Sequence, residues 1–302
     1  MKMYAIVGAT GNTGKVIAQT LLEQGQKVRV IGREANRLKD FAQNGAEPFV
    51  ADATDAEALK KAFTGAKAVY VMIPPNIGTP DAAAYQERVS DALTTAIEKA
   101  GVDYAVLLSS IGADKPSGTG PVVGLRKFEQ KLNGIARLNA LYIRAGYFME
   151  NLLPQVGVIK NLGMMAGPVR ASQTLPMIAT RDIGAYAAEA LLKLNFNGKQ
   201  TRELLGQRDV KYSEVAGVIG GAIGKPDLTY SELPASQLKP VLIQMGMSAS
   251  MADLILEMAQ AINSGHMAAL ESRSAGNTTP TSIEQFVAEV FVPMFTGKAA
   301  GA

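Results

Sequence analysis

The chain has 302 residues, of which 47% are hydrophobic and 19% charged, which suits one large α/β domain or a nucleotide-binding domain with a smaller partner. Its 30 basic and 27 acidic residues leave a formal net charge of +3 without a basic run, which argues against nucleic-acid binding. Cysteine is absent and His266 is the one histidine, so disulfides, thiolate nucleophiles and multi-histidine metal sites are excluded. The composition therefore predicts a small-molecule site without a metal.

The first 150 residues alternate short apolar runs with amphipathic helical patterns. The predicted strands cover residues 4–7, 27–31, 48–50, 68–73, 104–109 and 141–144, and the predicted helices cover 13–23, 56–63, 81–99 and 125–135. This alternation predicts an α/β fold with a Rossmann-type, doubly wound parallel sheet that binds ligands at the carboxyl ends of its strands. Because the first apolar run already serves as a strand, we expect no signal peptide, no membrane segment and a cytoplasmic protein.

The pattern changes after residue 150. Predicted helices cover residues 181–194, 213–223, 248–262 and 282–295, and predicted strands cover 175–179 and 228–232. Ser282 and Gln285 have the spacing of a capping box. We expect a Rossmann domain over residues 1–150, a smaller, mostly helical substrate-binding region over 151–295 that is intertwined with it, and a flexible tail over 296–302.

Methionine is concentrated in the second half, above all between Met245 and Met267. Helical methionines usually fill cores, and the alternative is a pliable apolar lid over a substrate, because methionine adapts to ligands of varied shape. The same segment is also open to interpretation as a partner-binding face.

The strongest motif is the glycine loop at residues 8–14, which follows a strand and opens a helix. In such a loop Gly8 permits the tight turn, Gly11 lets the backbone approach a pyrophosphate, and Gly14 allows close packing of helix on strand. The helix N-terminus then offers free N–H groups to the phosphates. We expect the cofactor to contact Gly8, Thr10, Gly11, Asn12, Thr13 and Gly14.

The residue at the end of the second strand indicates whether a Rossmann-type protein prefers NADP or NAD. NAD-binding proteins usually place a carboxylate there, whereas this chain has Arg33, with Arg37 one helical turn further on. A guanidinium pairs well with a 2′-phosphate, so we expect NADP(H) to be preferred over NAD(H). Glu34 complicates this prediction, but its side chain is free to point to solvent.

Residues after the third and fourth strands complete the predicted cofactor site. Asp52 and Ala53 follow the third strand, where Asp52 is suited to the adenine edge. The turn Ile73-Pro74-Pro75 forms a rigid apolar wall for the adenosine ribose. The alternatives are that Asp52 caps a helix and that the two prolines only punctuate a loop.

These residues carry a family resemblance that covers nearly the whole chain. Its parts are the GATGNTG loop, Arg33, Asp52, Ser109-Ser110 and residues 124–129, 146–152, 180–184 and 279–286. Together they resemble the NmrA-like group of atypical short-chain dehydrogenases/reductases. The resemblance implies an NAD(P)H-dependent reductase of quinones, azo dyes or triphenylmethane dyes, or a redox-sensing regulator without turnover.

Ordinary short-chain dehydrogenases use a serine, a tyrosine and a lysine four residues after the tyrosine. The resemblance assigns Lys127 to the lysine that holds the nicotinamide ribose, and Ser109 or Ser110 to the serine. Val123 stands where the tyrosine should be. Without that acid, carbonyl reduction and sugar epimerisation lose their proton donor.

Reduction of a quinone, azo or cationic-dye acceptor depends less on a protein acid, because a hydroquinone anion is a weak base. Tyr147 and Phe148 directly follow the sixth strand, and we expect them, with Lys127, to form the catalytic site. Asn151 would offer an amide hydrogen bond to the cofactor or acceptor. The alternative is that Tyr147, Phe148 and Asn151 only anchor the start of the second region.

The sequence therefore predicts an NADPH-dependent reductase of a small, flat, apolar acceptor, in a monomer or homodimer with no nucleic-acid or membrane partner. The alternative is a non-catalytic NADP(H)-sensing regulator that binds a partner protein.

Overall fold

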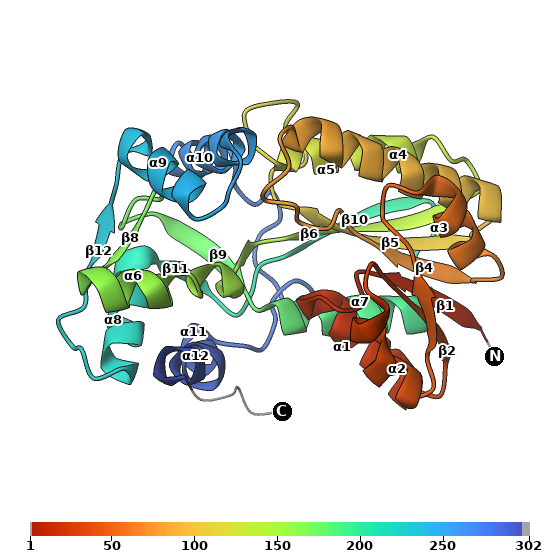
Figure 1. Cartoon of the computed structure of the whole chain (residues 1–302), viewed down its shortest axis with the longest axis horizontal. Coiled ribbons are helices and arrows are strands. Elements are labelled where there is room, and N and C mark those ends of the chain that lie inside the picture. The colour runs from red at the N-terminus through yellow and green to blue at the C-terminus, as the bar shows by residue number, and fades with distance from the viewer. Residues whose placement is uncertain (1, 298–302) are drawn as a thin grey trace.

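Seven parallel strands form the central sheet of this computed structural model, which describes residues 2–297 (Figure 1). In spatial order they are β10 (Lys199–Leu204), β6 (Asn139–Ala145), β5 (Tyr104–Ser110), β4 (Ala68–Val71), β1 (Met3–Val7), β2 (Lys27–Gly32) and β3 (Glu47–Val50). Every neighbouring pair is parallel, and the chain order reverses between β1 and β4. The expected doubly wound Rossmann-type sheet is confirmed.

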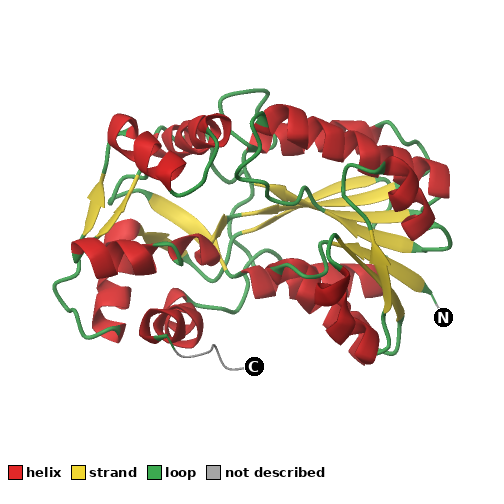
Figure 2. Cartoon of the chain, viewed as in Figure 1, coloured by secondary structure: helices red, strands yellow, loops and turns green. Residues whose placement is uncertain are grey.

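Helices cover both faces of this sheet (Figure 2). One face carries α1 (Asn12–Glu23), α2 (Lys39–Gln43) and α7 (Thr180–Lys193), with the short η1 (Ala35–Leu38) before α2. The other face carries α3 (Ala56–Phe63), α4 (Ala82–Ala100) and α5 (Val122–Asn133). Each layer encloses its own apolar core against the sheet, because both faces of a parallel sheet are buried.

The helix α4 illustrates why these segments are helical. Its buried apolar side chains recur at helical spacing: Tyr85, Val89, Ala92, Leu93, Ala96 and Ile97. Asp81 accepts the backbone N–H of Ala84 at the N-terminus, at 2.9 Å. Gly101 ends the helix in the left-handed region with φ of 72°.

Two segments beyond residue 150 belong to the Rossmann layer. β10 pairs in parallel with β6 as the seventh strand, although the sequence pattern predicted no strand there, and α7 packs against α1. The helices approach closely because Gly184 has no side chain: a Cβ there would lie 2.7 Å from the Cβ of Val16. The boundary expected at residue 150 therefore does not divide the architecture into two halves.

The remaining elements form a smaller lobe beside the sheet (Figure 1). They are β7 (Tyr147–Phe148), η2 (Met149–Leu152), α6 (Gln155–Leu162), β8 (Met165–Gly167), β9 (Thr174–Ile178), β11 (Asp209–Lys211), α8 (Tyr212–Ala222), β12 (Tyr230–Glu232), α9 (Ala235–Gln244), α10 (Ala249–Asn263), α11 (Ile283–Phe286), η3 (Val287–Phe291) and α12 (Val292–Thr296). The strand order is β11-β9-β7 in one small sheet and β12-β8 in the other. The sequence pattern missed α6 and α9, and α9 contains Pro240, a residue that usually ends a helix.

The helix predicted over residues 282–295 starts as expected and changes in its middle. The Ser282 hydroxyl accepts the backbone N–H of Gln285 at 3.1 Å, but the Gln285 side chain bonds Glu289 instead of returning to Ser282. The π-helical η3 separates α11 from α12. Residues 298–302 of the expected tail lie outside the described residues.

Candidate active site

The carboxyl ends of the central strands point toward the smaller lobe (Figure 2). A cavity of about 1280 Å³ is lined by residues of both parts. The Rossmann layer contributes the glycine loop, the ends of β2 and β3, and the loops after β4, β5 and β6. The smaller lobe contributes β9, α10 and the segment that follows α10. This is the sheet edge at which doubly wound proteins bind ligands.

The glycine loop has the expected backbone. Gly8 adopts φ of 69°, in the left-handed region, and its carbonyl accepts the backbone N–H of Gly11 at 2.9 Å. A Cβ on Gly14 would lie 2.3 Å from the Gly8 carbonyl oxygen, so the loop closes only with glycine there. Gly14 does not line the cavity, contrary to the expected cofactor contact, because it packs against the backbone of Gly8 and Ala9.

The first turn of α1 borders the cavity. Gly11 caps α1 without a side-chain hydrogen bond, and Thr10, Asn12 and Thr13 line the cavity beside it. The Thr13 hydroxyl lies 2.9 Å from the Tyr70 hydroxyl in the interior. Thr13 is therefore placed to offer a ligand its backbone N–H, together with the positive end of the helix dipole.

Two guanidinium groups stand at the end of β2. Arg33 and Arg37 are exposed and line the cavity, and Arg37 donates a 3.3 Å hydrogen bond to the Thr10 carbonyl. Glu34 pairs with Arg37 at 3.8 Å, whereas Arg33 lies near the carboxylate of Asp52. An exposed pair at this distance contributes little to stability.

Asp52 and Tyr85 shape the neighbouring part of the cavity. Asp52 accepts hydrogen bonds from the backbone and the hydroxyl of Thr54, at 2.8 and 2.6 Å, and these bonds with the charge of Arg33 lower its pKa. The cap of α3 is Asp55 and not Asp52. The Tyr85 hydroxyl donates to the Pro74 carbonyl at 3.1 Å and so fixes the loop after β4.

The remaining predicted residues of this region border the cavity as well: Ala53, Ile73, Pro74 and Pro75.

A buried network lies under the ends of β5 and β6. The Ser109 hydroxyl donates to the Glu129 carboxylate at 2.6 Å, and Glu129 accepts two further bonds from Arg144, at 3.0 and 2.6 Å. The hydrogen bonds to Glu129 raise the pKa of Arg144. Ser110 donates to the carbonyl of Ile111 at 2.9 Å. Both serines line the cavity, but each hydroxyl hydrogen is already committed within the protein.

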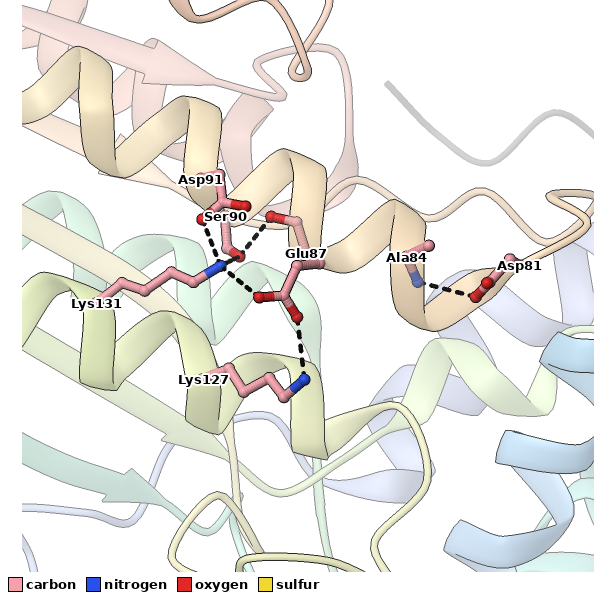
Figure 3. A network of polar contacts seen from close by, with 7 residues as sticks. All are labelled: Asp81, Ala84, Glu87, Ser90, Asp91, Lys127 and Lys131. Atoms are coloured by element: carbon pink, nitrogen blue, oxygen red, sulfur yellow. Dashed lines mark hydrogen bonds and ion pairs between the residues drawn. The ribbon is translucent and has the colours of Figure 1, made fainter.

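Lys127 lies away from the cavity, contrary to its expected position at the nicotinamide ribose. Its ammonium pairs with Glu87 of α4 at 3.0 Å, beside Lys131 (Figure 3). Neither Lys127 nor Val123 lines the cavity. Hydrogen bonds to the two lysines lower the pKa of Glu87. The cause is helix geometry, since residues two apart point about 200° away from each other. α5 turns Leu125 toward the cavity, so Val123 and Lys127 face elsewhere.

Tyr147, Phe148 and Asn151 all line the cavity. Burial raises the pKa of the Tyr147 phenol, and its contacts with Tyr212 and Asn151 offset part of that rise. The Tyr147 and Tyr212 rings meet edge to face with centroids 6.1 Å apart, and Tyr212 stacks on Tyr230 at 4.6 Å. Tyr147 and Phe148 thus border the cavity, and their strand β7 pairs in parallel with β9.

One face of α10 forms an apolar wall that the sequence placed only in part. Met251, Ile255, Met258 and Ile262 recur at helical spacing and line the cavity, together with Met247 and Met267. Met245 is 61% exposed and lies outside the lining. Met247, Met251, Met258 and Met267 therefore border the cavity, and Met258 and Met267 also pack against the core of the smaller lobe.

The two lobes are bonded to each other next to this wall. The backbone N–H of Ser248 donates to the Ile77 carbonyl at 2.8 Å, and the Ser250 hydroxyl accepts the N–H of Ala82 at 3.1 Å. The loop after β4 is thereby tied to the start of α10. Sequence reasoning missed these contacts between the lobes because they join residues about 170 positions apart.

Residues 2–297 contain neither a cluster of metal ligands nor a membrane-spanning helix. No group of three or more histidine or acidic side chains in that range is arranged to hold a metal ion. No helix in the same range is long and apolar enough to span a membrane. His266 is exposed, and its Nε2 lies 3.0 Å from the Ser117 carbonyl, outside the cavity lining.

The model of the NmrA-like family matches residues 1–287. The chain belongs to the NmrA-like family. Among curated proteins, this NmrA-like chain is 27% identical over 290 residues to the uncharacterized oxidoreductase YesF of Bacillus subtilis, covering 94% of this chain and 93% of that protein. The resemblance that the sequence motifs indicated is confirmed.

Solved structures share the fold of this NmrA-like protein. The NADPH-dependent quinone oxidoreductase QOR2 of Escherichia coli, complexed with NADPH, has a TM-score of 0.81 at 22% identity, covering 96% of this chain and 100% of that one. The triphenylmethane reductase of Citrobacter sp., complexed with NADP(H), has a TM-score of 0.79 at 19% identity, covering 94% and 98% of the two chains. At these identities the likeness establishes the fold.

Proposed function

We propose that this protein is an NADPH-dependent reductase that passes a hydride to a small, flat, conjugated acceptor of the quinone, azo-dye or triphenylmethane-dye type. The observation that carries the proposal is that one cavity extends from the glycine loop and Arg33 to the apolar side chains of Phe148 and Met258. Its volume of about 1280 Å³ exceeds the roughly 300–1,000 Å³ of most small-ligand pockets. The cavity is thus large enough to support a dinucleotide and a second molecule together.

The residues at one end fit a dinucleotide with a 2′-phosphate. Gly11 starts α1 without a side-chain cap, so the free N–H groups of the first turn are suited to a pyrophosphate. Arg33 and Arg37 offer guanidinium groups that suit a 2′-phosphate, where a carboxylate would repel it. These features favour NADP(H) over NAD(H).

The other end fits an acceptor that needs little proton assistance. When bound, NADPH would supply the hydride, and the chain's own residues would orient the acceptor and exclude water. The hydrogen of Ser109 is committed to Glu129, and α5 presents the apolar side chain of Leu125 to the cavity. An acceptor whose reduced anion is a weak base suits this lining better than a ketone, whose alkoxide must be protonated.

The names of similar proteins agree with this proposal. YesF is called an oxidoreductase, and the two solved relatives are called an NADPH-dependent quinone oxidoreductase and a triphenylmethane reductase. All three names support redox chemistry.

The decisive experiment follows the loss of NADPH absorbance with purified protein and a panel of quinones, azo dyes and cationic dyes. Simple aldehydes and ketones serve as the control set. We expect turnover with at least one conjugated acceptor and negligible turnover with the control set. Tight NADPH binding without turnover of any acceptor would instead indicate the regulator that the sequence left open, and absence of NADPH binding would overturn the proposal.

A further inference from the structure

The chain that follows α10 forms a separate wall of the cavity. Beyond Asn263 it runs back from the smaller lobe to the Rossmann layer without helix or strand. We call residues 267–273 the wall segment, because all of them except Leu270 line the cavity. The conformation of this segment therefore helps to set the shape of the acceptor half of the cavity, by which we mean the end that contains Phe148 and Met258.

Glu203, near the end of β10, holds the wall segment by its backbone. One carboxylate oxygen, Oε2, accepts the N–H groups of Leu270 and Glu271 at 2.8 and 2.7 Å. The Glu271 carboxylate in turn accepts the backbone N–H of Glu203 at 3.2 Å. Two bonds from successive peptide groups to one oxygen fix the orientation of both peptide planes, and bonds to a charged acceptor are the stronger kind.

Glu203 is an unusual group to use for a purely structural contact. The residue is 2% exposed, and its second oxygen, Oε1, has no hydrogen-bond partner among the described residues. Burying a carboxylate with one oxygen unpaired lowers stability, so an apolar side chain would pack here at less free-energy cost. Glu203 does not line the cavity itself, and its contact with the site runs through the wall segment.

Further bonds secure the far end of the wall segment. Arg273 donates to the carbonyls of Gly206 and Leu205, at 2.6 and 3.1 Å, and pairs with Asp209. Asn277, just beyond the wall segment, accepts the backbone N–H of Leu205 through its carbonyl at 2.8 Å. The part before Arg273 is held by the two bonds to Glu203 and by the Glu271 carboxylate, which also accepts a hydrogen bond from Arg202 at 3.2 Å.

We propose that Glu203 is a positioning residue for the acceptor half of the cavity, acting by holding the wall segment against β10. The inference rests on the proposed function where turnover is the readout. The proposal distinguishes acceptor binding from cofactor binding. Loss of the Glu203 bonds changes the shape of the acceptor half and leaves the glycine loop and Arg33 unchanged. Acceptor binding should therefore respond to Glu203, and cofactor binding should not.

The first test measures backbone amide hydrogen exchange, which needs no turnover. Glu203→Leu removes the acceptor atom, and we expect the amides of Leu270 and Glu271 to exchange about tenfold faster or more. Glu203→Gln keeps a carbonyl oxygen and should restore most of the protection. Glu203→Asp keeps the charge but shortens the reach, and it replaces the leucine variant if that variant does not fold. Unchanged exchange in the leucine or aspartate variant would overturn the proposal.

The second test separates acceptor from cofactor, with an unsubstituted naphthoquinone as the probe. In Glu203→Leu or Glu203→Asp we expect the acceptor KM to rise about tenfold, with the NADPH Kd within about twofold of the parent. Glu189→Leu is the matched control, since Glu189 pairs with Lys193 on the exposed face of α7. An equal loss of NADPH affinity would refute the positioning role. Lack of turnover of every conjugated acceptor by the parent protein would refute the proposed function alone, because the exchange test would still decide the role of Glu203.

Discussion

The hydroxyl of Ser109 on β5 donates a 2.6 Å hydrogen bond to the carboxylate of Glu129 on α5. Glu129 is 5% exposed and also binds Arg144 of β6, so its charge is compensated in the interior. Ser109 consequently offers the cavity only the lone pairs of its oxygen. A serine held in this way accepts a hydrogen bond from a ligand and does not donate one.

We expect the ion pair between Glu129 and Arg144 to contribute more to the free energy of unfolding than the hydrogen bond of Ser109 does. Glu129→Leu would leave Arg144 buried without its partner, and we expect the free energy of unfolding to fall by about 3–5 kcal/mol. Ser109→Ala removes one hydrogen bond and should lower it by about 1.5 kcal/mol. Urea denaturation of the two variants measures both values. Equal losses would show that the ion pair contributes nothing beyond the serine bond.

Arg33 should control the choice of cofactor. Arg33→Ala removes the guanidinium expected at the 2′-phosphate, so NADPH binding should weaken by about 1.5–3 kcal/mol while NADH binding barely changes. Calorimetric titration with both cofactors checks this. Arg137→Ala is the control, because Arg137 binds the Glu98 carbonyl at 2.8 Å and does not line the cavity. If Arg33→Ala weakens the binding of NADPH and NADH equally, Arg33 does not bind the 2′-phosphate.

Lys127 gives opposite expectations from sequence and from structure. The family pattern predicts that Lys127→Ala impairs cofactor binding and turnover together. The structure pairs its ammonium with Glu87 on a half-exposed surface, so we expect an unchanged NADPH Kd and a stability loss of about 0–1 kcal/mol. Titration with NADPH decides between them. A Kd that rises by an order of magnitude would show that Lys127 reorients toward the cofactor.

The methionine wall should serve the acceptor and not the cofactor. Met258→Lys places a charged group in the apolar part of the cavity, so the acceptor KM should rise about tenfold, or about 1.4 kcal/mol, at constant NADPH affinity. Met245→Lys is the matched control, because Met245 is 61% exposed and outside the lining. If both lysine variants behave like the parent, the wall does not contact the acceptor.

The pH dependence of turnover tests the role of the Tyr147 phenol. Burial raises the pKa of Tyr147 above its usual value of 10, so the phenol stays protonated across about pH 5.5–9 and produces no bend in kcat/KM there. We expect Tyr147→Phe to keep the quinone rate within about threefold of the parent, since the weakly basic product needs no protein acid. A variant that loses quinone turnover, or a parent enzyme that reduces ketones strongly, would make Tyr147 the missing acid.

The fold and the cofactor end of the site were predictable because the signals for them are local. A strand, the tight turn at Gly8 and the helix after Gly11 lie within a few residues of one another, and Gly14 packs on the same turn. Arg33 directly follows its strand, so its place at the strand end needs no tertiary information. The family match over residues 1–287 agrees with these motifs.

The family motif placed Lys127 wrongly because a sequence motif does not specify how a helix is rotated about its axis. Lys127 is assigned only because it lies four residues after the position of the missing tyrosine. That spacing does not indicate which face of α5 borders the cavity. That face is set by where α5 starts and by its packing on α4, where Gln86 donates to the Pro121 carbonyl at 2.9 Å. Leu125 faces the cavity as a result, and Lys127 pairs with Glu87.

What the sequence determined by itself is the parallel sheet, the glycine loop and the cationic strand end, since short-range spacing and residue type decide each of them. Only the tertiary structure decided that β10 completes the sheet, that the methionines of α10 border a cavity, and that Glu203 holds residues 67 and 68 positions away. These contacts depend on how distant segments pack together. No periodicity or local motif encodes such a pairing, because its free energy arises only once both segments are folded.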